Sequence, residues 1–447
     1  MVFSPILVMQ TNTSMKVINS GQISPFGGLN FVLEAFDDLG IGTLLNKELP
    51  VLPKQSKYEW RDLLYSFWSV YFCGGDCIED LSTNLKPSFS NSPLVKLCSA
   101  DRLLERMKEL SIPSEEFTAP RGKSRHEFSF NDTLNKLNVK ILKKTLSGGL
   151  SKKPVVLDYD NTLIFTRKSD AKMTYKKEFG YAPGVGIIDD KVVYVENRNG
   201  NSDAQTLQQE TLSRMFKVLD DEGIKIDVFR ADSGSYQLTT ILEASKHVDK
   251  FFIRARMSPL LNEAIGRIED WKEIELDGET AYRGSTSFTP FKQAAQRIKY
   301  KEPLKSYRCV VTKTKRRDGQ TNLFTGEAYN YGAIITNEHD LSNDQVVFFY
   351  NQRGKTEKEF DVLKNDFGWA SLPFSKLEQN TVFLIFTAIC KNLYSYTIGL
   401  FSKTFKGLKP QYRIKKFIFR FICVPAKWIK SSRYWKLRIY GGHAFKT

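Results

Sequence analysis

The feature that most constrains the fold is the order of apolar patterns between residues 155 and 253. Short runs rich in β-branched residues are typical of strands, and apolar residues at three- and four-residue steps are typical of helices. In order, we expect strands at 155–160, 184–188 and 192–195, a helix at 204–221, a strand at 226–229, a helix at 236–245 and a strand from 251. This succession predicts one mixed sheet with helices packed on it.

The predicted order is that of the ribonuclease H-like fold, so the expected class is α/β with a ribonuclease H-like mixed sheet. Residues 258–345 follow with strand-like runs and little helical pattern, which predicts a β-rich insertion. The apolar stretch at 382–390 is interrupted by Lys391 and is too short for a membrane span, so we expect a core helix. The six cysteines are scattered and match no zinc-site spacing, which favours reduced thiols.

Positive charge is concentrated in the last tenth of the chain. The net charge is +16, and no acidic residue occurs after Glu378. Residues 401–447 carry thirteen Lys and Arg side chains interleaved with aromatic residues. Such asymmetry indicates a polyanionic partner, either nucleic acid or an anionic membrane surface. We favour DNA contact, with Lys415, Lys416 and Arg420 among the contacting residues.

Three acidic positions stand where the predicted fold could gather them. Asp158 and Asp160 are two residues apart on the first strand and therefore point to the same face. Asp232 follows shortly after the strand predicted at 226–229, at its carboxyl end. Carboxylates that converge from different elements can hold two divalent cations about 4 Å apart, which is the requirement of two-metal phosphoryl transfer.

The third position, Glu357, belongs to a stripe of functional side chains. Tyr350, Arg353, Glu357 and Lys364 fall within an arc of about 60° if 350–364 is one helix of about 100° per residue. The same arithmetic excludes Glu359 and keeps Asp361 as a reserve ligand. A solvated charged face would show the same stripe, so helix geometry alone leaves both interpretations open.

The Tyr-x2-Arg-x3-Glu-x6-Lys spacing at 350–364 resembles the signature of one branch of bacterial DDE insertion-sequence transposases. Asp160-Asn-Thr resembles the first-strand motif of that family, and Phe229-Arg-Ala-Asp232-Ser-Gly resembles its second-Asp motif. The insertion between Asp232 and Glu357 is also where the family carries one. The resemblance covers about 150–370 well.

The resemblance implies that Asp160, Asp232 and Glu357 are catalytic metal ligands, with Asp158 and Asp361 as possible alternatives. It implies two Mg²⁺ or Mn²⁺ ions per active site. Arg353 and Lys364 would hold DNA phosphates near the cut, and Tyr350 would contact the terminal DNA. The implied activity is cut-and-paste transposition, in which transposon ends are cleaved and joined to target DNA.

The implied partners are double-stranded DNA, both terminal inverted repeats and target, and a second copy in a homodimer, with no membrane. The expected setting is the bacterial cytoplasm, associated with the nucleoid. Two alternatives remain. The run at 155–163 also matches the first motif of haloacid dehalogenase-like phosphatases, with Asp158 as nucleophile and Asp160 as acid/base. The chain could also be a non-catalytic DNA-binding protein with a degenerate nuclease fold.

The expected organisation has five segments. They are a mostly helical N-terminal DNA-binding domain with a linker at 111–127 (1–127), the first part of the catalytic domain (128–257), the β-rich insertion (258–345), the rest of the catalytic domain with the Glu-bearing helix and the following helix (346–400), and a basic aromatic tail expected to be helical (401–447).

Overall fold

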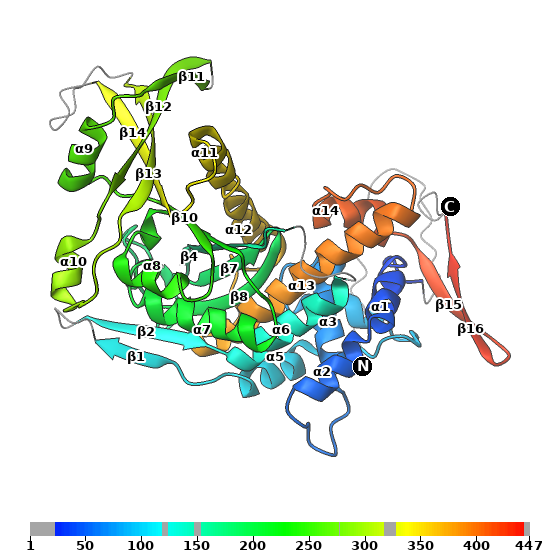
Figure 1. Cartoon of the computed structure of the whole chain (residues 1–447). Helices are drawn as coiled ribbons and strands as arrows, with labels where there is room; N and C mark the ends of the chain where they lie inside the picture. Colours follow the sequence, from blue (N-terminus) through cyan, green and yellow to red (C-terminus); the bar gives the residue numbers. More distant parts are fainter. Residues whose placement is uncertain (1–22, 119–123, 147–152, 277, 317–327, 442–447) are drawn as a thin grey trace, which may run out of the picture.

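A computed structural model describes residues 23–118, 124–146, 153–276, 278–316 and 328–441. Its centre is an 11-stranded mixed sheet, which confirms the predicted α/β class (Figure 1). Across the sheet the strands are β1 (Glu115–Thr118), β2 (Arg125–Phe130), β8 (Lys191–Arg198), β7 (Gly184–Ile188), β3 (Val156–Asn161), β9 (Val228–Ala231), β10 (Lys250–Arg254), β14 (Tyr329–Thr336), β13 (Tyr307–Lys315), β12 (Glu279–Phe288) and β11 (Lys272–Leu276).

The predicted order of elements between 155 and 253 is confirmed. β3 lies antiparallel to β7 and parallel to β9, and β9 lies parallel to β10. The first helix of this region, α7 (Gln208–Asp221), begins four residues later than expected. The reason is local, because the Asp203 side chain accepts hydrogen bonds from the backbone N–H groups of Gln205 and Thr206 and holds a turn there.

Helices cover both faces of the sheet. One apolar cluster joins one face of the strands to α6 (Asp132–Thr145), α7, α8 (Leu238–Ala244) and α9 (Pro259–Gly266). On the opposite face, α11 (Asn343–Asn351) packs beside β9 and β10, followed along the chain by α12 (Gly354–Asp366). The 28-residue α13 (Leu377–Thr404) packs on β8 on this face.

α13 contains the apolar stretch that the sequence predicts as a core helix, and this prediction is confirmed. The helix is long and apolar enough to cross a membrane by length and composition, but 83% of its most apolar window is buried inside the protein. Its neighbours are the N-terminal helices, which share one hydrophobic core with it. These helices are α1 (Leu29–Asp38), α2 (Ile41–Glu48), α3 (Trp60–Phe72) and α5 (Ala100–Glu109); the short α4 (Lys86–Ser88) contributes no buried side chain.

The β-rich insertion extends the main sheet. β14 pairs with β10, and β13, β12 and β11 continue outward in antiparallel order. α9 and the short α10 (Lys292–Arg297) accompany these strands, which project from one end of the molecule (Figure 1).

Two stretches before β7 contain strands where the sequence predicted none. The expected linker at 111–127 contributes β1 and the start of β2, which form the other edge of the main sheet. The Pro-rich composition that suggested a linker includes Pro113, which precedes β1. Between β3 and β7, a second, three-stranded sheet consists of β4 (Ile164–Phe165), β6 (Phe179–Tyr181) and β5 (Lys172–Met173).

The basic tail is only partly helical, so the expected helical tail is wrong for its second half. α14 (Ile414–Phe417) and a π-helical turn (Ile418–Ile422) are followed by a hairpin of β15 (Ala426–Ser431) and β16 (Tyr434–Ile439). Ser24 forms an antiparallel bridge with Ala426, and the Gly28 N–H donates to the Ile422 carbonyl at 3.2 Å. A Cβ at Gly28 would lie 2.1 Å from the Phe421 carbonyl oxygen, so this contact requires glycine.

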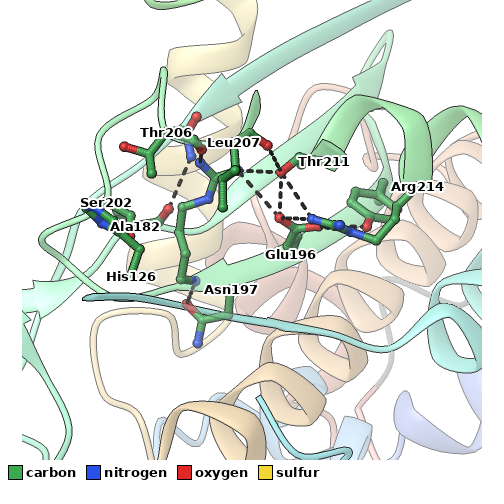
Figure 2. A network of polar contacts seen from close by, with 12 residues as sticks. His126, Ala182, Glu196, Asn197, Ser202, Thr206, Leu207, Thr211 and Arg214 are labelled. Carbon is green, nitrogen blue, oxygen red and sulfur yellow. Dashed lines mark hydrogen bonds and ion pairs between the residues drawn. The ribbon is translucent and has the colours of Figure 1, made fainter. Parts of the chain in front are cut away.

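A buried polar network ties β8 to α7 and to β3. Glu196, which is 0% exposed, accepts two hydrogen bonds from the Arg214 guanidinium at 2.9 and 3.0 Å and one from Thr211 at 2.6 Å (Figure 2). Arg198 donates to the Tyr159 hydroxyl at 3.0 Å. β7 lies between these strands, and a Cβ at Gly184 would come within 2.3 Å of the Tyr159 oxygen. The network therefore fixes the strand that carries Asp160.

Replacing this buried carboxylate should destabilise the fold. Glu196→Gln keeps the shape of the side chain but leaves the guanidinium groups of Arg198 and Arg214 without a counter-charge. This change should lower the free energy of unfolding by about 3 kcal/mol. Thermal denaturation followed by circular dichroism would detect the loss. Glu34→Gln, at an exposed position of α1, serves as the control and should leave the midpoint unchanged. Equal midpoints for the two variants would contradict the assigned role of the network.

Candidate active site

The parallel pairing of β3 with β9 brings the first two predicted carboxylates together. In this register Asp158 is opposite Arg230, and Tyr159 is opposite Ala231. Asp160 and Asp232 follow at the next positions of the two strands, at their carboxyl ends. Because side chains two residues apart share a face, Asp158, Asp160, Arg230 and Asp232 all point toward the face covered by α11.

Asp158 is engaged in a buried ion pair. Its two carboxylate oxygens accept hydrogen bonds from Nε and Nη2 of Arg230 at 2.6 and 2.7 Å, and each side chain is only about 5% exposed. The remaining Arg230 nitrogen donates to the Phe349 carbonyl of α11. This arrangement joins β3, β9 and α11, and it leaves Asp158 poorly placed to bind a metal or to act as a nucleophile.

Asp232 terminates β9 and caps the short 3₁₀ turn Ser233–Ser235. Its side chain accepts a hydrogen bond from the Gly234 N–H at 2.8 Å. Any Cβ at Gly234 would lie 2.8 Å from the Asp232 carboxylate, so the Ser-Gly-Ser sequence after the aspartate allows this close turn. This capping bond holds the carboxylate in place at the end of β9.

The helix predicted over 350–364 is interrupted. α11 ends at Asn351 and α12 begins at Gly354, and backbone bonds from Arg353 to Tyr350 and from Thr356 to Arg353 tighten the turn between them. The backbone stays in the right-handed helical region, so the chain keeps its general direction. Tyr350 and Arg353 are buried, whereas Glu357 is exposed in the first turn of α12.

Arg353 reaches the carboxylate of Asp160. Its Nη2 donates to Asp160 Oδ2 at 2.7 Å, and both side chains are largely buried. The Arg353 Nε has no hydrogen-bond partner among the described residues. Burial raises the pKa of Asp160 to about 7; Arg353 opposes this rise, and the neighbouring charges of Asp232 and Glu357 add to it. The three carboxylates therefore share one region of negative potential that Arg353 only partly neutralises.

The donor set fits divalent cations, although the carboxylates are not drawn into a tight cluster. Mg²⁺ and Mn²⁺ take carboxylate oxygens, and burial with mutual repulsion is the situation that a bound cation would relieve. Among the described residues, the acidic groups that converge within 4.8 Å are elsewhere: Asp76 and Asp80 with Cys77, and Glu127 and Asp170 with Glu378. In the latter group, Ser114 and Asn199 donate to Glu127, and Tyr181 and the Leu377 N–H donate to Asp170.

The other predicted residues lie farther along α12 and in the tail. Asp361 forms an exposed ion pair with Arg413 at 2.6 Å, which directs it toward the tail. Burial lowers the pKa of Lys364. Lys415, Lys416 and Arg420 are exposed on α14 and the π-helical turn after it, and Lys415 lies 3.6 Å from Asp366.

Two arginines near the site were missed in the sequence. Arg230 is a charged residue inside an apolar strand, and such a residue requires a buried partner; the opposite charge of Asp158 on the first strand was the available signal. Arg254 ends β10 and lines a cavity of about 260 Å³ between the insertion strands and α11, together with Tyr350 and Arg283. No sequence motif marks it.

Comparisons with known proteins identify the family. The family model described as transposase DDE domain, group 1, matches residues 9–447. Among solved structures, one similar chain belongs to a cryo-EM structure of the piggyBac transposase synaptic complex with hairpin DNA. The TM-score is 0.42 at 11% identity, over 88% of this chain and 79% of that chain. No curated protein matches the chain.

The buried pair at Asp158 can be tested by a double-mutant cycle. Asp158→Asn leaves the Arg230 cation buried without a partner and should destabilise the protein by about 3–5 kcal/mol. The double variant Asp158→Asn/Arg230→Gln removes both charges and should be more stable than the single variant. Thermal denaturation of the four proteins measures the coupling. Additive losses would show that the two side chains do not act as a pair.

Proposed function

The chain belongs to the transposase DDE family, group 1, and is a DNA transposase; from this premise we propose that Asp160, Asp232 and Glu357 are its catalytic carboxylates. The observation that carries the assignment is the register of β3 and β9, which puts Asp160 and Asp232 at adjacent strand ends. Glu357 joins them from the first turn of α12, where its charge acts on Asp160.

The three carboxylates are proposed to hold two divalent cations, Mg²⁺ or Mn²⁺, as DDE transposases use divalent metals. Such cations would supply activation of the attacking oxygen and stabilisation of the leaving oxygen in phosphoryl transfer. Asp160 provides a carboxylate whose burial disfavours its own charge, so a cation that bound there would displace a proton. The capping bond from Gly234 orients Asp232.

Arg353, Tyr350 and Lys364 are proposed to position DNA around these carboxylates. Arg353 donates through Nη2 to Asp160, and its Nε bonds no described residue, so its planar fork could also donate to a phosphate oxygen. Tyr350 and Arg254 line the adjacent cavity. The half-buried ammonium of Lys364 lies farther along α12 and would contact DNA next to the cut.

The proposed substrate is double-stranded DNA, both the transposon ends and the target. Exposed Lys415, Lys416 and Arg420 would neutralise phosphates away from the catalytic carboxylates. We propose a homodimer in the assembled complex, since two ends must be processed together in cut-and-paste transposition. The proposed setting is the bacterial nucleoid. The phosphatase alternative loses support because its nucleophile, Asp158, is held by Arg230.

Cleavage of the element's own ends tests the carboxylate assignment. Asp160→Ala, Asp232→Ala and Glu357→Ala should each reduce Mg²⁺-dependent cleavage by about a thousandfold, equivalent to a loss of about 4 kcal/mol of transition-state stabilisation. Binding to the ends should remain. Asp361→Ala is the matched control on the same helix and should cleave normally, because Asp361 faces Arg413. Normal cleavage by Glu357→Ala would refute the assignment.

Cation binding can be measured without DNA. Mn²⁺ should raise the thermal midpoint of the wild-type protein, because a ligand that binds only the folded state stabilises it. Glu357→Gln should lose much of this shift. Glu378→Gln, in the separate acidic group at Glu127 and Asp170, should keep it. The opposite pattern would place the cations in that group.

A further inference from the structure

The three-stranded sheet of β4, β6 and β5 lies at the catalytic edge of the main sheet. β4 begins three residues after β3 ends, and β6 ends three residues before β7 begins. Because β3 and β7 are antiparallel, both connections leave the main sheet at the carboxyl end of β3. That is the end at which Asp160 and Asp232 stand. DNA that approaches the carboxylates from the β3–β7 side of this edge would pass beside the β4–β6 sheet.

The β4–β6 sheet is firmly anchored on the body. Ile164 and Tyr181, paired across β4 and β6, are 2% and 0% exposed. Ser169 donates to the Ser375 carbonyl at 2.7 Å, and the Leu377 N–H donates to Asp170 at 2.6 Å. These contacts hold the small sheet in a fixed place relative to the start of α13, so its outer residues form a defined surface.

That surface carries unpaired positive charge. Residues 165–179 contain Arg167, Lys168, Lys172, Lys176 and Lys177, and no ion pair involves any of them within the described part of the chain. The stretch contains two acidic residues, Asp170 and Glu178. Asp170 accepts hydrogen bonds from the Tyr181 hydroxyl and the Leu377 N–H. The turn after β5 is closed by a hydrogen bond from the Lys177 N–H to the Thr174 carbonyl at 3.0 Å.

Large apolar side chains are exposed among these cations. Of the sixteen exposed large hydrophobic residues of the described chain, four lie in this short stretch: Phe165, Met173, Tyr175 and Phe179. Tyr175, at the tip of the turn, is 73% exposed, and the Lys176 ammonium lies 5.6 Å from its ring. An aromatic and cationic surface of this kind suits nucleic acid, because rings stack on bases and ammonium groups neutralise phosphates.

We propose that the β4–β6 sheet is a DNA-binding surface that holds the substrate strand beside the catalytic carboxylates. Its lysines contact the phosphates of this strand, and Tyr175 stacks on a base that is unpaired near the cut. The inference rests on the proposed function for its substrate. A second copy of this chain is the less suitable occupant, because each copy is strongly basic and would present like charge to these five cations.

The charge contribution is tested by the salt dependence of DNA binding. The full-length Lys172→Gln/Lys176→Gln variant is compared with Lys153→Gln/Lys225→Gln, whose exposed lysines precede β3 and β9 at the opposite edge of the main sheet. The probe is a short duplex with the element's terminal sequence. The first variant should bind less tightly, with a slope of log affinity against log salt that is smaller by up to about 2. The control should match the wild type.

The ring contribution is tested at Tyr175. Tyr175→Ala should weaken binding of a duplex with unpaired terminal nucleotides by about tenfold, with a smaller effect on the fully paired duplex, and Tyr175→Phe should restore it. Equal salt slopes for the two double-lysine variants would overturn the inference. An altered oligomeric state in sedimentation with unchanged DNA binding would also overturn it, by indicating a protein partner.

These outcomes are separable from the proposed function. If the wild type cleaves its ends and Glu357→Ala does not, the catalytic assignment stands whatever the lysine variants do. If the wild type binds no DNA, both the proposed function and the present inference are wrong.

Discussion

The ion pair between Asp158 and Arg230 is the interaction on which the site depends most. The parallel strands β3 and β9 pair Asp158 with Arg230, and Asp160 and Asp232 follow at the ends of the two strands. The like charges of Asp160 and Asp232 repel each other, which opposes the pairing of the strands. Asp158 and Arg230 attract each other, and the Arg230 guanidinium also donates to the carbonyl of Phe349 on α11. The attraction between Asp158 and Arg230 therefore offsets the repulsion between Asp160 and Asp232.

The hydrogen bond from Arg230 to Phe349 also determines where the helix after α11 lies. Because α11 is tied to β9 at Phe349, the turn at 352–353 lies close to the end of β3, and Arg353 meets Asp160 there. α12 then carries Glu357 on from this turn. Three carboxylates that repel one another are thus carried by elements that are each fixed by other contacts, including the Glu196 network that holds Tyr159. The repulsion among the carboxylates is therefore confined to the site, and contacts elsewhere stabilise the surrounding fold.

Sequence patterns predicted the parts of this structure that rest on long, regular periodicity. The strand and helix order from β3 to β10 and the buried α13 follow from apolar spacing. The β4–β6 sheet could not be found this way, because strands of two or three residues, such as Ile164–Phe165, carry no period. Alternating cations and aromatic residues at 426–439 fit a helix and a strand about equally, and the pairing that decides between them is non-local.

The site was predicted less completely than the fold. The spacing of Tyr350, Arg353 and Glu357 is a local property and was visible in the sequence, but the turn that separates α11 from α12 changes how these side chains are presented. The choice between Asp158 and Asp160 depended on a partner 72 residues away, since only the register of β9 brings Arg230 opposite Asp158. Strand neighbours that are distant in sequence leave no periodic signal.

The bridge between Ser24 and Ala426 and the seating of Gly28 against Phe421 have a consequence for how the protein is made. α1 packs on α2 and α3, but the cover of Phe31, by Phe405 and Phe421, comes from residues synthesised almost four hundred positions later. A ribosome must therefore deliver nearly the whole chain before the first helix can complete its packing. Copies interrupted by a premature stop codon upstream of this closure would lose more than a basic tail, because the face of α1 at Phe31 would stay uncovered.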